Sequence, residues 1–281
     1  MYDRGAGVAQ DYDEAVRLFT LSARQGLARG EYNLGTMYAK GLGVSQDYHH
    51  AGQLYKSAAE KGLAEAQLAV SALYMTGEGL PRDYKEAMRF STKAAQQGLA
   101  KAHYNLGLMY SQGLGVKQDY SEAMRLFMKA AQQGLGEAQY NLGVIYGQGL
   151  GVPPNYAESA NWYSLAAKQG VAQAQYNLGV MYERGEGVLQ DNAEAARLYT
   201  RAAEQGLAEA QYSLGNMYAR GEGVEQDPQR AYMWFNLAAA QGDELAQRNS
   251  DVIAKAMSKQ QLADAQQLAS ECLARDYKEC G

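Results

Sequence analysis

The sequence has few residues suited to metal or redox chemistry, with 2 cysteines and 3 histidines among 281 residues. It lacks the His-Glu-x-x-His and Cys-x-x-Cys spacings that are typical of zinc sites. It also lacks Gly-x-Ser-x-Gly, in which a hydrolase presents its serine nucleophile. We therefore expect no metal site, no cofactor, no catalytic residue and no enzymatic activity.

Positive charge and long apolar runs are also missing. The net charge is −5, which argues against a nucleic-acid binder that relies on a broad basic surface. No stretch approaches the roughly 18 consecutive apolar residues of a membrane-spanning helix. We expect neither nucleic acid nor membrane insertion.

Glycine and tyrosine are abundant instead, with 31 Gly and 22 Tyr against only 4 Phe and 2 Trp. Both follow a period of 36 residues, and the helical spacing of the tyrosine columns favours core packing over an aromatic ligand cage. The pair Gly-x-Gly recurs at Gly5/Gly7, Gly41/Gly43, Gly77/Gly79, Gly113/Gly115, Gly149/Gly151, Gly185/Gly187 and Gly221/Gly223. The motif Tyr-Asn-Leu-Gly at residues 32–35 returns at 104–107, 140–143 and 176–179, and diverges to Leu-Ala-Val-Ser at 68–71. The abundant glycines therefore recur at fixed positions in seven repeats and do not indicate flexible linkers.

Each repeat reads as two helices. Residues 64–76 place Ala66, Val70 and Leu73 on one helical face, and the glycines that follow end this helix. The second helix begins after Asp83, and Glu86 three positions later resembles a capping box, in which each side chain bonds the other residue's backbone N–H.

The connections between helices are short, so consecutive helices are expected to pack antiparallel. A single pair cannot bury its apolar face, but stacked pairs share a continuous core. The sequence predicts an all-α solenoid of 36-residue helix-turn-helix repeats. Glycines such as Gly143 are expected to allow close approach of helix backbones.

The repeat is similar to two known families. Leu-Gly-x-x-Tyr and the alanine columns resemble the tetratricopeptide repeat, whose unit has 34 residues. Residues 101–124, with Tyr104-Asn105-Leu106-Gly107, Gly113-x-Gly115-Val116 and Asp119-Tyr120-x-Glu122-Ala123, resemble the Sel1-like repeat. The resemblance covers about residues 1–247. It implies a right-handed superhelix, an adaptor or scaffold role without a reaction, and a concave groove lined by the first helices.

The groove residues follow from that resemblance. One column of the first helices holds Asn33, Asn105, Asn141 and Asn177, with Ser213 in the same register. An amide side chain both donates and accepts, which suits a peptide backbone. The alternative is that this column bonds the backbone of a neighbouring repeat. His103, in a column that is otherwise mainly Gln, is expected to face the groove and not to act as a base.

A second column carries positive charge near both ends of the array. Arg184 and Arg220 occupy it late in the chain, and Arg4 and Lys40 occupy it early. An extended acidic ligand could be held at these two points. Solvated helix ends explain the column equally well, because cations favour helix C-termini.

The ends of the chain depart from the repeat. Met1-Tyr2 aligns with Met37-Tyr38, so the first repeat is expected to lack the start of its first helix. Seven repeats over 1–247 and a helical cap over 248–281 are the predicted domains. In the cap we expect a polar helix over 244–257, then a helix from Ser258 to about Ala274 with Leu273 facing inward.

Cys272 and Cys280 are the two cysteines. In a continuous helix their Cα atoms would lie roughly 12 Å apart, too far for a disulfide, whereas a tail that turns back could form one. The tail also looks like that of exported Sel1-like proteins of Gram-negative bacteria. The alternative is two free thiols in a cytoplasmic protein.

Together these features predict a non-enzymatic scaffold that binds a protein or peptide in its groove. A bacterial periplasmic or secreted location is expected, with a cytoplasmic one as the alternative. The alternative function is a structural or envelope-associated spacer that contacts glycan or assembles other envelope proteins. The oligomeric state stays open, with a monomer as the expectation.

Overall fold

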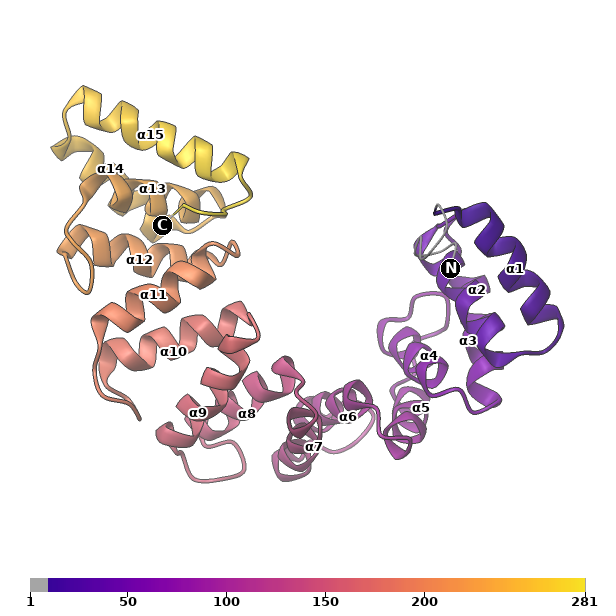
Figure 1. Ribbon diagram of the computed structural model, residues 1–281. Coiled ribbons are helices and arrows are strands. Elements are labelled where there is room, and N and C mark those ends of the chain that lie inside the picture. Colours follow the sequence, from indigo (N-terminus) through magenta and orange to yellow (C-terminus); the bar gives the residue numbers. More distant parts are fainter. Residues whose placement is uncertain (1–9, 281) are drawn as a thin grey trace. The chain divides into compact units, whose positions relative to one another are not determined.

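The computed structural model describes residues 10–280, and the expected incomplete first helix lies outside them. The described residues form helices and no strand (Figure 1). The helices are α1 (Tyr12–Arg24), α2 (Ala28–Lys40), α3 (Tyr48–Glu60), α4 (Ala64–Thr76), α5 (Tyr84–Gln96), α6 (Ala100–Gln112), α7 (Tyr120–Gln132), α8 (Gly136–Gln148), α9 (Tyr156–Lys168), α10 (Ala172–Arg184), α11 (Asn192–Ala203), α12 (Ala208–Arg220), α13 (Pro228–Ala240), α14 (Glu244–Ala256) and α15 (Lys259–Ala274). The predicted pairing of two helices per repeat is confirmed.

The helices group into two compact units. One unit contains α1 to α7 and the other contains α8 to α15. Within each unit each helix up to α14 packs against the one before it, and α15 packs against α13. The division into an array over 1–247 and a cap over 248–281 stays a prediction.

The second helices begin at side-chain caps. Asp83 Oδ1 accepts from the backbone N–H groups of Lys85 and Glu86 at the start of α5. The reciprocal half of the predicted capping box is wrong there, because the Glu86 carboxylate binds the guanidinium of Arg89, 2.7 Å away. The same pairing joins Glu14 to Arg17, Glu122 to Arg125 and Glu194 to Arg197. A complete capping box forms between Ser258 and Gln261 at α15.

In five of the Gly-x-Gly pairs the second glycine lies against the preceding repeat. Gly79 has φ +71°, and a Cβ built on it would lie 2.1 Å from the carbonyl oxygen of Tyr48 at the start of α3. Any side chain would therefore push the two repeats apart. Equivalent contacts under 3 Å join Gly43 to Tyr12, Gly115 to Tyr84, Gly187 to Tyr156 and Gly223 to Asn192.

The glycine of the Leu-Gly pair makes room for an aromatic ring. A Cβ on Gly107 would lie 2.6 Å from the Phe127 ring. The same ring contact joins Gly35 to Tyr55, Gly143 to Tyr163, Gly179 to Tyr199 and Gly215 to Phe235. The expected reason for these glycines, close approach of helix backbones, is therefore incomplete, since rings of the following helix occupy the space.

The divergent segment at residues 68–71 obeys the same packing rule. Ser71 replaces the glycine, and Ser91, 20 residues later, replaces the ring. Both side chains are buried, and their Oγ atoms lie 2.6 Å apart. Ser71 Oγ also donates to the Ala87 carbonyl at 2.8 Å. The divergence is thus a compensated pair of substitutions.

The tyrosine columns differ in burial. Tyr55, Tyr163 and Tyr199 are buried, as expected for core residues. The column of Tyr32 is half-buried, with its rings tilted against that core column at centroid distances of 5.4–5.8 Å. Tyr156, at the start of α9, is 49% exposed, so the expectation of core packing is wrong for this residue.

A row of paired glutamines links consecutive helices. Gln67 Nε2 donates to the Ala59 carbonyl at 3.2 Å, and its Oε1 accepts from Gln97 Nε2 at 2.9 Å. The Gln–Gln contact recurs at Gln139–Gln169, Gln175–Gln205 and Gln211–Gln241. Glu31 and Lys61 form an ion pair at the equivalent positions, 2.7 Å apart. We call this set the glutamine seam, and it satisfies polar groups that would otherwise be buried unpaired.

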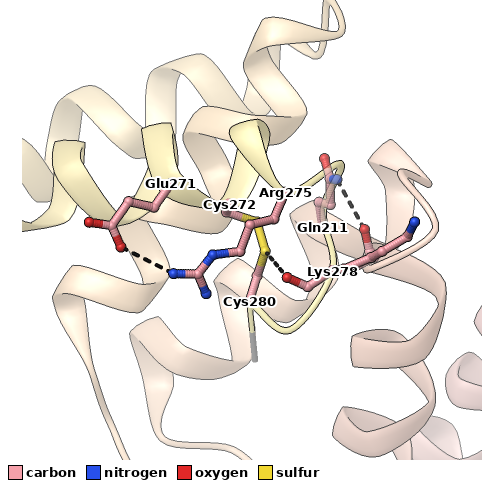
Figure 2. Close-up of a disulfide and its surroundings, with 7 residues drawn as sticks. Gln211, Glu271, Cys272, Arg275, Lys278 and Cys280 are labelled. Carbon is pink, nitrogen blue, oxygen red and sulfur yellow. Dashed lines mark hydrogen bonds and ion pairs between the residues drawn. A yellow bond between two sulfur atoms is a disulfide. The ribbon is translucent and has the colours of Figure 1, made fainter.

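The C-terminal helices end in a closed loop. The predicted helices over 244–257 and from Ser258 to Ala274 are confirmed as α14 and α15. The inward placement of Leu273 is wrong, since it is 53% exposed and Cys272 is buried instead. Cys272 pairs with Cys280 across a Cα–Cα distance of 5.4 Å (Figure 2). The loop also places the Tyr277 ring over Gly206, 3.2 Å from where a Cβ would lie.

Candidate functional site

We define the first-helix face as the exposed side of α2, α4 and α6 in one unit and of α8, α10 and α12 in the other. Asn33, Asn105 and Asn177 are half-buried on this face, and each lines a hollow. Asn141 instead donates from Nδ2 to the Glu137 carbonyl of its own helix at 2.8 Å. That contact differs from the neighbouring-repeat bond weighed as the alternative.

The hollow around Asn177 also contains Arg184, so these two predicted residues lie together. The Arg184 side chain is 64% exposed, and its Nη1 lies 3.9 Å from Glu186 in the following loop. Arg220 has the same exposure and lies 3.7 Å from Glu222. Exposed ion pairs at such distances contribute little to stability. Both guanidinium groups therefore keep donors directed to solvent.

The hollow beside α8, α9 and α10 has a volume of about 310 Å³. Tyr163 and Ser159 of α9 contribute buried polar groups, and Val180 and Met181 of α10 contribute apolar ones. Burial raises the pKa of Tyr163 to about 12, although hydrogen bonds with Asn177 and Ser159 oppose the shift. The hydroxyl therefore stays protonated at neutral pH and remains a donor.

His103, which is expected to face the groove, is half-buried. It occupies the column of the glutamine seam, where its counterparts bond the preceding helix. Its Nδ1 atom is buried without a hydrogen-bond partner in the part of the chain that the structure describes. Gln133, which would complete the seam, donates to the Lys129 carbonyl instead. Burial, together with Lys129 and Arg125, lowers the pKa of His103.

His103→Gln is expected to raise the free energy of unfolding by about 1 kcal/mol, because it restores the seam with Gln133. The gain should be larger at pH 5.5 than at pH 8. The pKa of His103 is lower in the folded protein, so below the ordinary value near 6.5 the unfolded chain binds a proton more readily and wild type loses stability. Urea unfolding at both pH values measures this. A gain that persists in a Gln133→Ala background would contradict the explanation.

Sequence reasoning missed Tyr163, Ser159 and Gly147 as residues of this hollow. Tyr163 was placed in the core, which describes its ring but not its hydroxyl. Ser159 did carry a signal, because the other six repeats have alanine in its column: Ala15, Ala51, Ala87, Ala123, Ala195 and Ala231. Gly147 lies in a column that holds different residue types in the other repeats, so the glycine does not stand out in the sequence.

Among the described residues, no cluster of His, Cys, Asp or Glu could hold a metal ion. Nor does the described part of the chain contain a helix with the length and hydropathy needed to cross a membrane.

Comparison with known proteins identifies the repeat. The model of the Sel1 repeat matches residues 1–27, 28–63, 64–99, 100–135, 136–171, 172–207 and 208–243. The chain belongs to the Sel1-repeat family. No curated protein matches this Sel1-repeat chain.

Two solved structures support the fold. A Sel1 repeat protein from Oxalobacter formigenes is 39% identical over 88% of this chain and 72% of its own, with a TM-score of 0.77. A protective antigen of uropathogenic Escherichia coli strains, with an SLR fold, is 28% identical over 100% of this chain and 76% of its own, with a TM-score of 0.60. The Sel1 and tetratricopeptide-like fold is generally a protein-interaction scaffold, and the Sel1-repeat family is typically non-catalytic.

Proposed function

We propose that this protein is a non-enzymatic scaffold that binds a protein or peptide through its first-helix face. The observation that carries the proposal is that Asn33, Asn105 and Asn177 each line a hollow on that face. An amide group both donates and accepts, which suits an extended peptide backbone and supports this proposal.

Around Asn105 the hollow suits an apolar side chain of such a peptide. Leu68, Ala69 and Ala72 line it in the divergent repeat, and Lys101 stands beside them. Where four other repeats have Tyr-Asn, this one has the apolar pair Leu68-Ala69. In typical interfaces a small number of such anchoring contacts provides most of the binding affinity.

We further propose a bacterial periplasmic or secreted location. The Cys272–Cys280 disulfide supports it, because disulfides persist in oxidising compartments. The two structural relatives described above are bacterial, and one of them is a protective antigen. A glycan-binding spacer would need exposed aromatic rings on the first-helix face. The Tyr32 column instead packs half-buried against the core, which favours a peptide ligand.

Asn33→Ala combined with Asn105→Ala tests the proposal. Proteins captured by wild type from a periplasmic extract should be lost or weakened at least tenfold with this variant. Asn161→Ala, an exposed asparagine on the second helix α9, is the matched control and should retain them. The free energy of unfolding, measured by thermal melting, should be within about 1 kcal/mol of wild type for both variants, because no buried bond is removed. Equal capture by all three proteins would refute groove binding.

A further inference from the structure

The repeat at residues 136–171 contains a hollow whose counterpart one repeat later is occupied by a glutamate. In that later repeat Tyr199 donates its hydroxyl proton to Glu183 Oε2 at 2.5 Å. Shifting both residues by 36 positions leads to Tyr163 and Gly147. Gly147 has no side chain, so no carboxylate of this chain reaches Tyr163 from that position.

A second substitution in the same repeat adds to the hollow. Ser159 replaces the alanine of the other six repeats, and its Oγ donates to the Gly143 carbonyl at 2.7 Å. A Cβ on residue 147 would lie 2.9 Å from this Oγ. Ser159 thus favours glycine at position 147. The two departures together leave space beside the Tyr163 hydroxyl, whose hydrogen bonds are with Asn177 and Ser159.

The charges around the hollow allow an anion to enter. Arg184 contributes a guanidinium that is only loosely paired, and Glu186 is the opposing carboxylate 3.9 Å from it. Glu183 is bonded to Tyr199 and does not line this hollow. An entering carboxylate would have a phenol donor at its inner end and an Arg donor beside it, and charge-assisted hydrogen bonds of this kind are the stronger ones.

We propose that this hollow binds the side-chain carboxylate of a glutamate from the partner peptide, in the place that Glu183 takes one repeat later. The inference rests on the proposed peptide-binding function, because it assumes that the partner lies along the first-helix face. Val180 and Met181 would contact the methylene groups of the glutamate. The carboxylate would accept from the Tyr163 hydroxyl and from Arg184.

The first experiment uses a capped glutamate, N-acetyl-glutamate N-methylamide, and NMR of protein labelled at the tyrosine rings. The Tyr163 signal, assigned from Tyr163→Phe, should shift saturably with a Kd of about 1–10 mM, typical of one isolated contact. The matched glutamine compound should bind at least tenfold more weakly. N-acetylalanine has only a C-terminal carboxylate. It therefore tests whether the hollow takes a peptide C-terminus in place of a glutamate side chain. No Tyr163 shift up to about 50 mM, or equal binding of the glutamine or alanine compound, would overturn the proposal.

The second experiment fills the hollow with the chain's own carboxylate. Gly147→Glu with Ser159→Ala reproduces the residues of the next repeat and should abolish the capped-glutamate shift. Tyr163→Phe is the milder variant, since the column holds phenylalanine at three described positions, Phe19, Phe127 and Phe235. It should weaken binding about tenfold, by loss of one hydrogen bond, and the ring signal of Tyr156, which also lines the hollow, reports this binding. Unchanged binding in either variant would contradict the proposal.

The two proposals can fail separately. If Asn33→Ala with Asn105→Ala loses the partner but the filled hollow retains it at full strength, the glutamate pocket is wrong and the scaffold function stands. If the Asn variant retains the partner while the capped glutamate still binds at Tyr163, the pocket stands and the groove function fails.

Discussion

Gly107→Ser is expected to lower the free energy of unfolding by about 1–3 kcal/mol, because the new Cβ would lie 2.6 Å from the Phe127 ring. Phe127→Ser alone should cost about 3–5 kcal/mol, since it empties a buried ring site. The double variant should cost clearly less than the sum of the two. It creates the small-side-chain pair that Ser71 and Ser91 already form, with their Oγ atoms 2.6 Å apart.

Urea unfolding followed by circular dichroism measures this cycle. We expect an interaction energy of about 1–2 kcal/mol in favour of the double variant, within the range seen for residues in contact. Ala72→Ser, on an exposed position of α4, is the control for adding a hydroxyl and should be neutral. If the double variant loses as much free energy of unfolding as the two single variants together, the glycine is not needed to make room for the ring.

Reduction of the Cys272–Cys280 disulfide is expected to lower the stability of the C-terminal end by about 2–3 kcal/mol, from the entropy of a short closed loop. The loop holds Asp276, Tyr277 and Glu279 at positive φ, a conformation that is costly for residues with a Cβ. An opened loop would relax these residues and withdraw the Tyr277 ring from Gly206.

Hydrogen exchange provides the readout, with faster exchange expected in α15 and around Gly206 after reduction. Alkylation of the denatured, unreduced protein, followed by mass, should label neither cysteine. In Cys280→Ser, adding reductant should change nothing further. Two labelled cysteines before reduction would contradict the disulfide and remove the main support for an oxidising compartment. Identical exchange before and after reduction would show that the disulfide does not stabilise this end of the chain.

The candidate site was only partly accessible from the sequence. Asn177 and Arg184 could be predicted because residues of the same kind recur at their positions in other repeats, 36 residues or a multiple of 36 away. The hollow they share depends on Gly147, Ser159 and Tyr163, which belong to two helices and act through contacts 16 residues apart. His103 illustrates the same limit. The sequence predicts that it faces the groove, yet its counterparts bond across helices in the glutamine seam.

The amino-acid sequence by itself determined the helices, their caps and the repeat. Helix periodicity, aspartate caps and positive-φ glycines act over three to five residues, so their signals are complete within each repeat. The tertiary structure alone decided which substitutions compensate for each other. Ser71 with Ser91, Glu31 with Lys61, and Gly147 with Tyr163 are 16 to 30 residues apart. Their meaning depends on the volume and hydrogen-bonding groups that a neighbouring helix brings to them, and packing sets both.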